Sequence, residues 1–431
     1  MPEICLVLTS AAANAIRDAT SWGHMTLRMS RSDSTGIVRA LSDGNGPKRQ
    51  VEIPAGHFLQ TGDDFPNSIW YRVSADVNLH WLFALAKHSK VDLDAFASMI
   101  PTGFRQPGGA AYYAITHVPR PAIEEGAENR DLEAPEFAIW YVSPEGAMPL
   151  DIDVQTEQTG ASLLAPQWPV DDVRHGRVLL VGAGSIGGAA AQAMATAGIG
   201  LLHLLDPGRL RWHNLPRHVC GPRHVGKLKV EALRADIEAT RAETRVVTHE
   251  YDVIRHTDAV RDLLAEIDVI VCTADGVLPR RVVSHLARRA GIPVVLACVL
   301  ADGAYGDLMR LWPWPDHGCY QCRLDTLTAT GGLVPALEPG SGYLAQHHAI
   351  TAVGTDLHLV GQLAAKMAVA TYLQCKGHHD QWFAGEHAVV ALRPEPGWSA
   401  PYDLTQAGQV RWHPPTPPWP GCPTCTNADS A

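Results

Sequence analysis

Short runs of apolar residues alternate with segments of helical periodicity in the central part of the chain. Five of these runs have the length and residue types of buried strands, and they lie at 178–181, 201–206, 245–252, 268–273 and 293–299. The periodicity between them predicts helices at 185–197, 226–241, 257–266 and 279–290. Strands that alternate with helices form a mainly parallel sheet covered on both faces, so we expect an α/β fold with its ligand site at the carboxyl ends of the strands.

The first 160 residues show a different pattern, in which short strand-like runs accompany one helical segment. The strand-like runs lie at 4–8, 69–73 and 137–142, and the helical pattern spans 77–90. Polar, glycine-rich breaks separate these elements, which favours an α+β domain. We therefore expect an accessory α+β domain over 1–160, a linker over 158–176, an α/β domain over 175–393 and a proline-rich tail over 394–431.

The composition is that of an ordinary globular protein, with 46% hydrophobic and 19% charged residues in a chain of 431. A formal net charge of −10 argues against a nucleic-acid-binding protein, because such proteins normally carry a basic surface. No apolar run approaches the ~18 residues of a membrane helix, and no basic region precedes the apolar patch near the N-terminus. We expect a cytoplasmic protein that binds neither nucleic acid nor membranes.

A glycine motif, Gly182-x-Gly184-x-x-Gly187, follows the first buried strand and opens an alanine-rich helix. The first glycine allows a tight turn, the second lets the backbone approach a phosphate, and the third lets helix and strand pack closely. The helix N-terminus adds free N–H donors and a partial positive charge. Asp206 ends the next strand about 20 residues later, where a carboxylate meets a ribose hydroxyl in Rossmann-like folds. The motif therefore predicts a nucleotide site.

The residues after Asp206 indicate which nucleotide is bound. Asn214-Leu-Pro-Arg217 and Val-Gly-Lys-Leu-Lys229 supply an amide and two cations, which a dehydrogenase does not need and an enzyme acting on ATP does. Together with Asp275 at the end of a later strand, these motifs resemble the ThiF-like superfamily, whose members activate ubiquitin and ubiquitin-like sulfur carriers. The resemblance covers roughly residues 175–428. From the residues alone, Asp275 could instead cap the following helix.

The resemblance implies an ATP-dependent adenylation site in a ThiF-type domain. The glycine loop would hold phosphate and Asp206 the ribose, while Asn214, Arg217 and Lys229 would bind and neutralise the triphosphate. Asp275 resembles the family's metal-coordinating acid and would hold Mg²⁺ for in-line attack by a carboxylate.

Two departures from the family pattern concern the same site. The family usually carries a second acid two residues after the strand-end Asp, and here Gly208 stands there. In dimeric members an arginine-rich segment before the first strand lends an arginine to the neighbouring site. This chain offers only Arg174 in that region. We expect a homodimer. Which residue, if any, supplies an arginine to the site of the neighbouring subunit stays open.

Two C-x-x-C pairs predict a structural zinc site. Cys319 and Cys322 form the first pair, and Cys422 and Cys425 form the second after a proline-rich arm over 414–420. Four thiolates suit a closed tetrahedral Zn²⁺ site. The resemblance implies the same arrangement, because the family pins its C-terminal tail to the core in this way. One pair acting in redox chemistry is a weaker interpretation, since a thioredoxin-like context is absent.

A nucleophilic cysteine for a thioester step is harder to find. Family members with such a step keep a cysteine in the crossover loop, yet 323–346 contains none. Cys272 and Cys298 lie in predicted core strands, where a cysteine is usually a small buried hydrophobe. Cys375 ends a long predicted helix beside basic residues and is the leading candidate, and Cys220 is a second.

The sequence thus predicts adenylation of the C-terminal carboxylate of a small ubiquitin-like or sulfur-carrier-like protein. A thioester and a conjugating enzyme could follow. The fused accessory domain resembles the activating enzymes of bacterial ubiquitin-like conjugation operons, some of which are linked to antiviral defence. Its histidines lack the spacing of the JAMM metalloproteases, which favours docking or dimerisation. The alternatives are a peptide-adenylating enzyme without a thioester step, a non-catalytic partner-binding half and, most distant, an NAD dehydrogenase.

Overall fold

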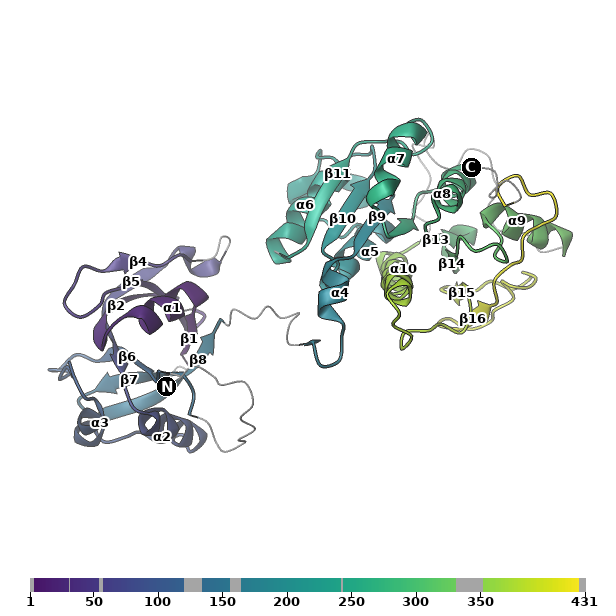
Figure 1. Ribbon diagram of the computed structural model, residues 1–431. Helices are drawn as coiled ribbons and strands as arrows, with labels where there is room; N and C mark the ends of the chain where they lie inside the picture. Colours follow the sequence, from purple (N-terminus) through teal and green to yellow (C-terminus); the bar gives the residue numbers. More distant parts are fainter. Residues whose placement is uncertain are drawn as a thin grey trace. The chain divides into compact units, whose positions relative to one another are not determined.

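The computed structural model describes residues 4–30, 32–53, 57–119, 134–155, 164–241, 243–330 and 352–425. The chain divides into two compact units, Met1–Thr159 and Gly160–Ala431, each with its own sheet and core (Figure 1). No helix among the described residues combines the length and the apolar character that a membrane span requires.

The first unit is an α+β barrel. Its elements are β1 (Cys5–Leu8), α1 (Ser10–Asp18), β2 (Trp22–Ser30), β3 (Thr35–Leu41), β4 (Arg49–Gln50), β5 (Asp63–Arg72), α2 (Ala75–Ala86), α3 (Leu93–Met99), β6 (Tyr112–His117), β7 (Phe137–Ser143) and β8 (Gly146–Val154). The strand order is β1-β8-β7-β6-β5-β2-β3-β4, and β1 also pairs with β3, so the sheet closes on itself. The strand expected at 69–73 is the end of the longer β5, and the helix expected at 77–90 is α2.

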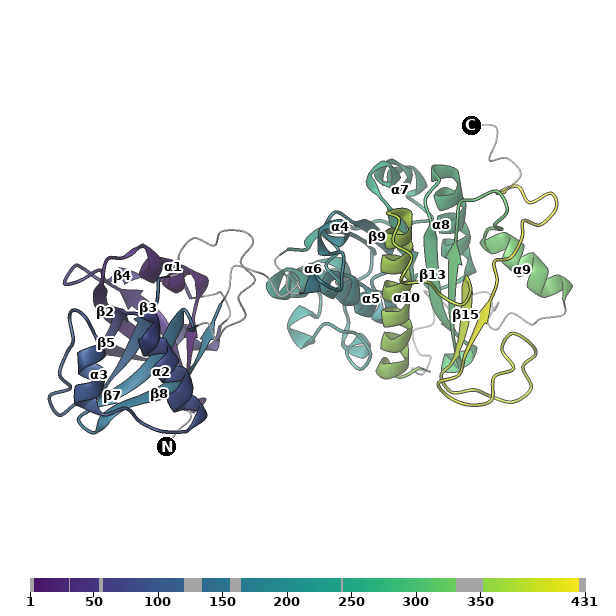
Figure 2. The same ribbon diagram turned by 60° about the horizontal axis from the view of Figure 1, so that its bottom comes forward.

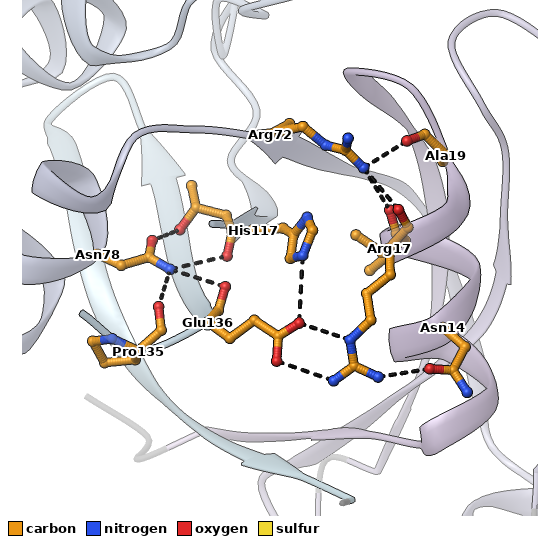
Figure 3. A network of polar contacts seen from close by, with 10 residues as sticks. Asn14, Arg17, Ala19, Arg72, Asn78, His117, Pro135 and Glu136 are labelled. Atoms are coloured by element: carbon orange, nitrogen blue, oxygen red, sulfur yellow. Dashed lines mark hydrogen bonds and ion pairs between the residues drawn. The ribbon is translucent and has the colours of Figure 1, made fainter. Parts of the chain in front are cut away.

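A polar network joins α1 to the strand ends of this barrel (Figure 3). Glu136 accepts hydrogen bonds from Arg17 Nε at 2.7 Å and Nη2 at 3.0 Å, and Arg72 donates to carbonyl groups at the end of α1. His117 is 2% exposed, its Nε2 lies 3.5 Å from Glu136, and burial lowers its pKa to about 4. His117 is therefore neutral near pH 7, and no histidine in the described part of the unit belongs to a cluster of metal-ligand type.

The second unit is the α/β fold expected from the alternating pattern. Its elements are α4 (Val170–Arg174), β9 (Arg177–Val181), α5 (Ser185–Thr196), β10 (Leu201–Leu205), α6 (Lys229–Thr240), β11 (Arg245–His249), α7 (Thr257–Leu263), β12 (Val269–Cys272), α8 (Val277–Ala290), β13 (Val294–Leu300), β14 (Tyr305–Leu311), α9 (Tyr320–Ala329), α10 (Gly354–Cys375), β15 (His387–Ala391) and β16 (Val410–His413). The sheet order is β11-β10-β9-β12-β13-β14-β15-β16. The first five strands run parallel, which confirms the mainly parallel sheet, and the last three extend it in antiparallel fashion.

Two helical layers cover this sheet (Figures 1 and 2). Alternate residues of β9 point to opposite faces: Val178 and Leu180 pack with α5, α6 and α10, whereas Leu179 and Val181 pack with α7, α8 and α9. Figure 2 shows α10 lying beside α5, and both helices pack on the same face of the sheet. A side chain at Gly361 of α10 would start 2.4 Å from the Ile186 carbonyl of α5, so the close approach of the two helices needs glycine there.

Several boundaries differ from the expectation. The linker expected at 158–176 already contains α4, whose Val173 is fully buried in the core of the second unit. The crossover loop expected from residue 323 begins inside α9, which continues to Ala329, and residues 331–346 of that loop lie outside the described residues. Within the tail expected over 394–431, β16 adds an edge strand to the sheet.

Candidate functional site

The glycine loop lies at the carboxyl end of β9 and leads into α5. Gly182 has a φ of 95°, and a Cβ there would lie 2.7 Å from the backbone nitrogen of Ala274. A Cβ at Gly187 would lie 1.9 Å from the Gly182 carbonyl oxygen, so helix and strand could not approach as they do. Gly184 caps α5, and a Cβ there would meet nothing within 4 Å. The N-terminus of α5 is therefore open to a ligand, as an anion site requires.

Asp206 braces this loop from the end of β10. Its Oδ2 accepts the Ala183 N–H at 2.8 Å, its Oδ1 accepts the Gly208 N–H at 2.6 Å, and Lys229 Nζ lies 3.8 Å from Oδ2. A side chain at position 208 would begin 2.8 Å from Asp206 Oδ1, so the site has no room for a second acid without local movement. The carboxylate thus joins the glycine loop, the turn after β10 and the start of α6.

The Asn214–Arg217 segment is anchored at both ends of its short turn. Asn214 Oδ1 accepts the Arg211 N–H at 2.9 Å, and the Asn214 carbonyl accepts the Arg217 N–H at 3.0 Å. The Arg217 carbonyl oxygen lies 2.8 Å from Nε2 of His358, on the first turns of α10. Gly354 lets α10 approach, because a Cβ there would already lie 3.3 Å from Arg217 Cα. The half-buried Arg217 side chain is therefore carried on a fixed backbone.

Asp275 follows β12 at the same edge of the sheet as the glycine loop. Thr273 connects the two, because its hydroxyl donates to the Gly182 carbonyl at 2.7 Å. Asp275 is exposed, and its carboxylate makes no hydrogen bond or ion pair within the part of the chain that the structure describes. The N-cap of α8 is Gly276, with no side chain capping the helix. The structure therefore does not support the helix-cap interpretation of Asp275.

The structure does not bring Cys375 to this edge. Cys375 is the last residue of α10, whereas His358 near the start of that helix contacts Arg217. At a rise of 1.5 Å per residue, His358 and Cys375 lie about 25 Å apart along the axis of α10. Cys375 is exposed, yet partial burial of its thiol and the nearby Asp268 raise its pKa. Distance and an unfavourable thiol pKa together argue against it as the nucleophile.

Cys220 lies much closer to the site but is 1% exposed. Burial raises its pKa to about 12, so the thiolate needed for nucleophilic attack is scarce near neutral pH. Neither cysteine candidate therefore presents an accessible thiolate beside the glycine loop.

The two C-x-x-C pairs come together, as expected for a metal site. The four Sγ atoms of Cys319, Cys322, Cys422 and Cys425 all lie within 4.8 Å of one another. The Cys319–Cys322, Cys319–Cys422 and Cys322–Cys425 separations are 3.8, 3.6 and 3.7 Å. A tetrahedron with metal–sulfur bonds of about 2.3 Å has edges of about 3.8 Å, so the donor set fits Zn²⁺. These separations are far longer than the ~2.05 Å of a disulfide.

Sequence analysis missed three side chains that organise the site: Thr273, His358 and His218. His218 is buried beside the glycine loop, with Nε2 3.0 Å from the Ala183 carbonyl oxygen. Its position directly after Arg217 was the only signal that could have drawn attention to it. The partners of Thr273 and His358 lie 91 and 141 residues away in the chain, so no local pattern marks them.

Comparison with known proteins provides independent evidence on this chain. The protein named adenylyltransferase and sulfurtransferase uba4 of Aspergillus niger is 28% identical over 222 residues, which cover 48% of this chain and 46% of that protein. The sulfur carrier protein ThiS adenylyltransferase of Escherichia coli is 28% identical over 154 residues, 34% of this chain and 57% of that one. The chain thus spans about half the length of the curated relatives it matches.

Among solved structures, Escherichia coli MccB is similar with a TM-score of 0.44 and 19% identity, over 59% of this chain and 68% of that one. A likeness at this level does not bear on the substrate. The family-level match is broader, because residues 160–388 correspond to the ThiF family and make up more than half of the chain. On that match, and on the agreement of the fold with it, this chain belongs to the ThiF family.

Proposed function

We propose that this chain is an ATP-dependent adenylyltransferase that acts on the C-terminal carboxylate of a small ubiquitin-like or sulfur-carrier protein. The observation that carries the proposal is the open N-terminus of α5 beside the Asp206–Lys229 pair, with the backbone of Arg217 anchored to α10 and the next residue, His218, against the glycine loop. An exposed helix N-terminus with a lysine beside it is complementary to a polyphosphate, and the proposal adds the guanidinium of Arg217 to this positive charge. The names of the curated relatives, which call them adenylyltransferases, support the same chemistry.

The reaction assigned to this site is a substitution at the α-phosphorus of ATP. A carboxylate oxygen of the carrier forms the new bond to phosphorus, the bond to the bridging oxygen breaks, and pyrophosphate leaves with its electron pair. In this proposal the glycine loop orients the phosphates, Asp206 the ribose, and Asn214, Arg217 and Lys229 the triphosphate. The cations offset the repulsion between two anions, which is the main barrier to the step.

Asp275 is the proposed magnesium ligand. An exposed carboxylate that makes no hydrogen bond or ion pair with the described residues, at the edge that carries the glycine loop, is suited to that role. Mg²⁺ bound there would reduce the negative charge of the phosphates. Asp275 itself would hold the ion and orient it, since Mg²⁺ is usually bound through one or two carboxylates together with substrate phosphates.

The four-cysteine cluster is the proposed structural zinc site. Its thiolates would tie the tail after β16 to the start of α9, and the Trp419 N–H, 3.1 Å from Cys322 Sγ, would orient that ligand. Four sulfur ligands leave no position for water, so the proposed role is stabilisation.

Adenylation of a peptide or carrier without a thioester step is a second candidate. It is favoured by the placement of the cysteines, because Cys375 lies at the far end of α10 and Cys220 is buried. Transfer to a conjugating enzyme, assembly as a homodimer and a role in bacterial ubiquitin-like conjugation all belong to the first candidate. The accessory unit is then a docking module.

The test combines purified protein with ATP, Mg²⁺ and purified ubiquitin-like or sulfur-carrier proteins. The proposal predicts carrier-dependent exchange of labelled pyrophosphate into ATP. A non-reducing gel separates the two candidates, because only a thioester gives an adduct that a reducing agent removes. The absence of exchange with every such carrier, from protein that binds ATP, would contradict the assigned substrate class.

A further inference from the structure

The imidazole of His218 lies between two segments of the adenylation site. Its Nε2 is 3.0 Å from the carbonyl oxygen of Ala183 in the glycine loop, and its Nδ1 is 3.1 Å from the backbone nitrogen of Cys220. The residue is 7% exposed, and a Cβ at Gly188 would lie 3.6 Å from its ring, so the ring also rests against the first turn of α5.

These two partners determine which nitrogen carries the proton. A backbone N–H can only donate, so Nδ1 must be the unprotonated acceptor for Cys220. A carbonyl oxygen can only accept, so Nε2 must carry the hydrogen that is donated to Ala183. Both contacts are satisfied only by the neutral imidazole with its proton on Nε2.

We propose that His218 is a positioning residue of the adenylation site, whose neutral imidazole fixes the glycine loop relative to the segment that carries Arg217. The inference rests on the proposed function. The glycine loop sets where the phosphates lie, and the Arg217 segment sets where the guanidinium lies. His218 joins the two through one ring, 35 residues from Ala183 along the chain.

The other hydrogen bonds of the Arg217 segment show why the contacts of His218 matter. The Arg217 N–H is held by the Asn214 carbonyl, and its own carbonyl lies 2.8 Å from His358 of α10. These bonds attach the segment to itself and to α10, but not to the glycine loop. His218 supplies the direct connection to that loop. A displacement of about 1 Å between charged groups and phosphates is enough to lower reaction rates by about a hundredfold.

The proposal also predicts how the site responds to acid. Among the described residues, the charged and titratable side chains that act electrostatically on the ring are those of Lys229 at the start of α6, His358 on α10 and Asp206 after β10. Burial, Lys229 and His358 lower the pKa of His218, while the Ala183 carbonyl and Asp206 raise it, and the net direction is downward. Protonation would place a hydrogen on Nδ1 against the Cys220 N–H and break that bond. ATP affinity should therefore fall as His218 is protonated, below its ordinary pKa of about 6.5.

Three substitutions separate positioning from packing. In His218→Gln the side-chain amide offers one acceptor and a donor group, so it can make both contacts and does not titrate. In His218→Asn the same groups sit on a shorter side chain that cannot reach both partners, and His218→Ala removes both. The control His117→Gln replaces a buried histidine in the core of the first unit, whereas this site belongs to the second unit.

The experiment measures the dissociation constant of ATP in the presence of Mg²⁺ by calorimetry, on full-length protein whose folding is checked by its thermal transition and zinc content. We expect His218→Ala and His218→Asn to weaken ATP binding about tenfold or more, while His218→Gln stays within about threefold of the parent near pH 7.5. As pH is lowered to about 5.5, the parent and the His117→Gln control should lose affinity relative to His218→Gln.

Parent-like ATP affinity in folded His218→Asn would overturn the proposal, and so would a loss in His218→Gln as large as that in His218→Asn. The parent protein is the positive control, and the affinities of the variants are compared with its affinity for ATP in the same assay. A parent protein that binds no ATP at all would overturn the proposed function and this inference with it.

Discussion

The carboxylate of Asp206 offers the sharpest single perturbation of the nucleotide site. It accepts two backbone N–H groups, from Ala183 at 2.8 Å and Gly208 at 2.6 Å, and lies 3.8 Å from Lys229 Nζ. In Asp206→Asn the amide keeps one acceptor oxygen and turns its NH₂ group toward the other donor. One charge-assisted hydrogen bond is lost, one N–H loses its acceptor, and Lys229 loses its counter-ion.

The magnitude follows from these losses. A hydrogen bond to a charged group contributes about 1.5–3 kcal/mol, and an unpaired buried N–H costs about 1–3 kcal/mol. Because the two figures partly describe the same broken contact, a destabilisation of about 2–4 kcal/mol is expected. At about 2–4 °C per kcal/mol, that corresponds to a fall in Tm of about 4–16 °C. Because the glycine loop loses its brace, ATP affinity should fall about tenfold or more.

Asp268→Asn is the matched control. Asp268 Oδ2 accepts the Arg177 N–H at 2.9 Å at the beginning of β9, the opposite edge of the same sheet. It should therefore lose stability while keeping ATP affinity within about twofold of the parent. Thermal unfolding and ATP calorimetry on both variants check the prediction. Parent-like ATP affinity in Asp206→Asn, or an equal loss of affinity in Asp268→Asn, would refute the assignment of the brace to the nucleotide site.

Three further predictions address other parts of the chain. Cys422→Ser should abolish stoichiometric zinc, measured by elemental analysis, and lower Tm while ATP still binds; full zinc content would contradict the four-cysteine site. Cys375→Ser should leave unchanged any carrier adduct that a reducing agent removes, as judged on a non-reducing gel; loss of such an adduct in the variant would identify Cys375 as the nucleophile. His117 has a folded pKa of about 4 against about 6.5 unfolded, so it contributes stability that is present above pH 6.5 and lost as pH falls toward 4. His117→Gln should remove this part of the acid dependence, about 3 kcal/mol at most, in urea unfolding; an unchanged dependence would contradict the buried neutral state.

The nucleotide loop and the parallel sheet could be predicted because their signals are local. Strand length, helical periodicity and glycine spacing are properties of short segments, and the structure has the glycine loop at the end of β9, as expected. The four-cysteine cluster could also be predicted, because each C-x-x-C pair supplies two metal ligands and needs only one other such pair to complete a tetrahedral site.

The remaining features depend on contacts between distant segments. His358 meets Arg217 only because α10 packs against α5, and no pattern within either segment encodes that approach. β16 was not predicted, because it lies in a proline-rich segment and pairs with β15 alone. An edge strand needs only one neighbouring strand and tolerates an irregular sequence. The alternative that Asp275 caps a helix was open because Asp275 precedes α8, yet the structure has Gly276 at the N-cap position. Cys375 was a plausible nucleophile from its sequence neighbours, but it lies at the far end of α10, away from the glycine loop.

The central claim is tested most directly by pyrophosphate exchange in Asp275→Ala, with exposed Asp258→Ala of α7 as the control. With Mg²⁺, ATP and an active carrier, Asp275→Ala should exchange about a thousandfold more slowly than the parent, because several kcal/mol of transition-state stabilisation are lost. Its fold and zinc content should stay normal, and Asp258→Ala should exchange at the parent rate. Exchange by Asp275→Ala at close to the parent rate would contradict the proposed adenylation site.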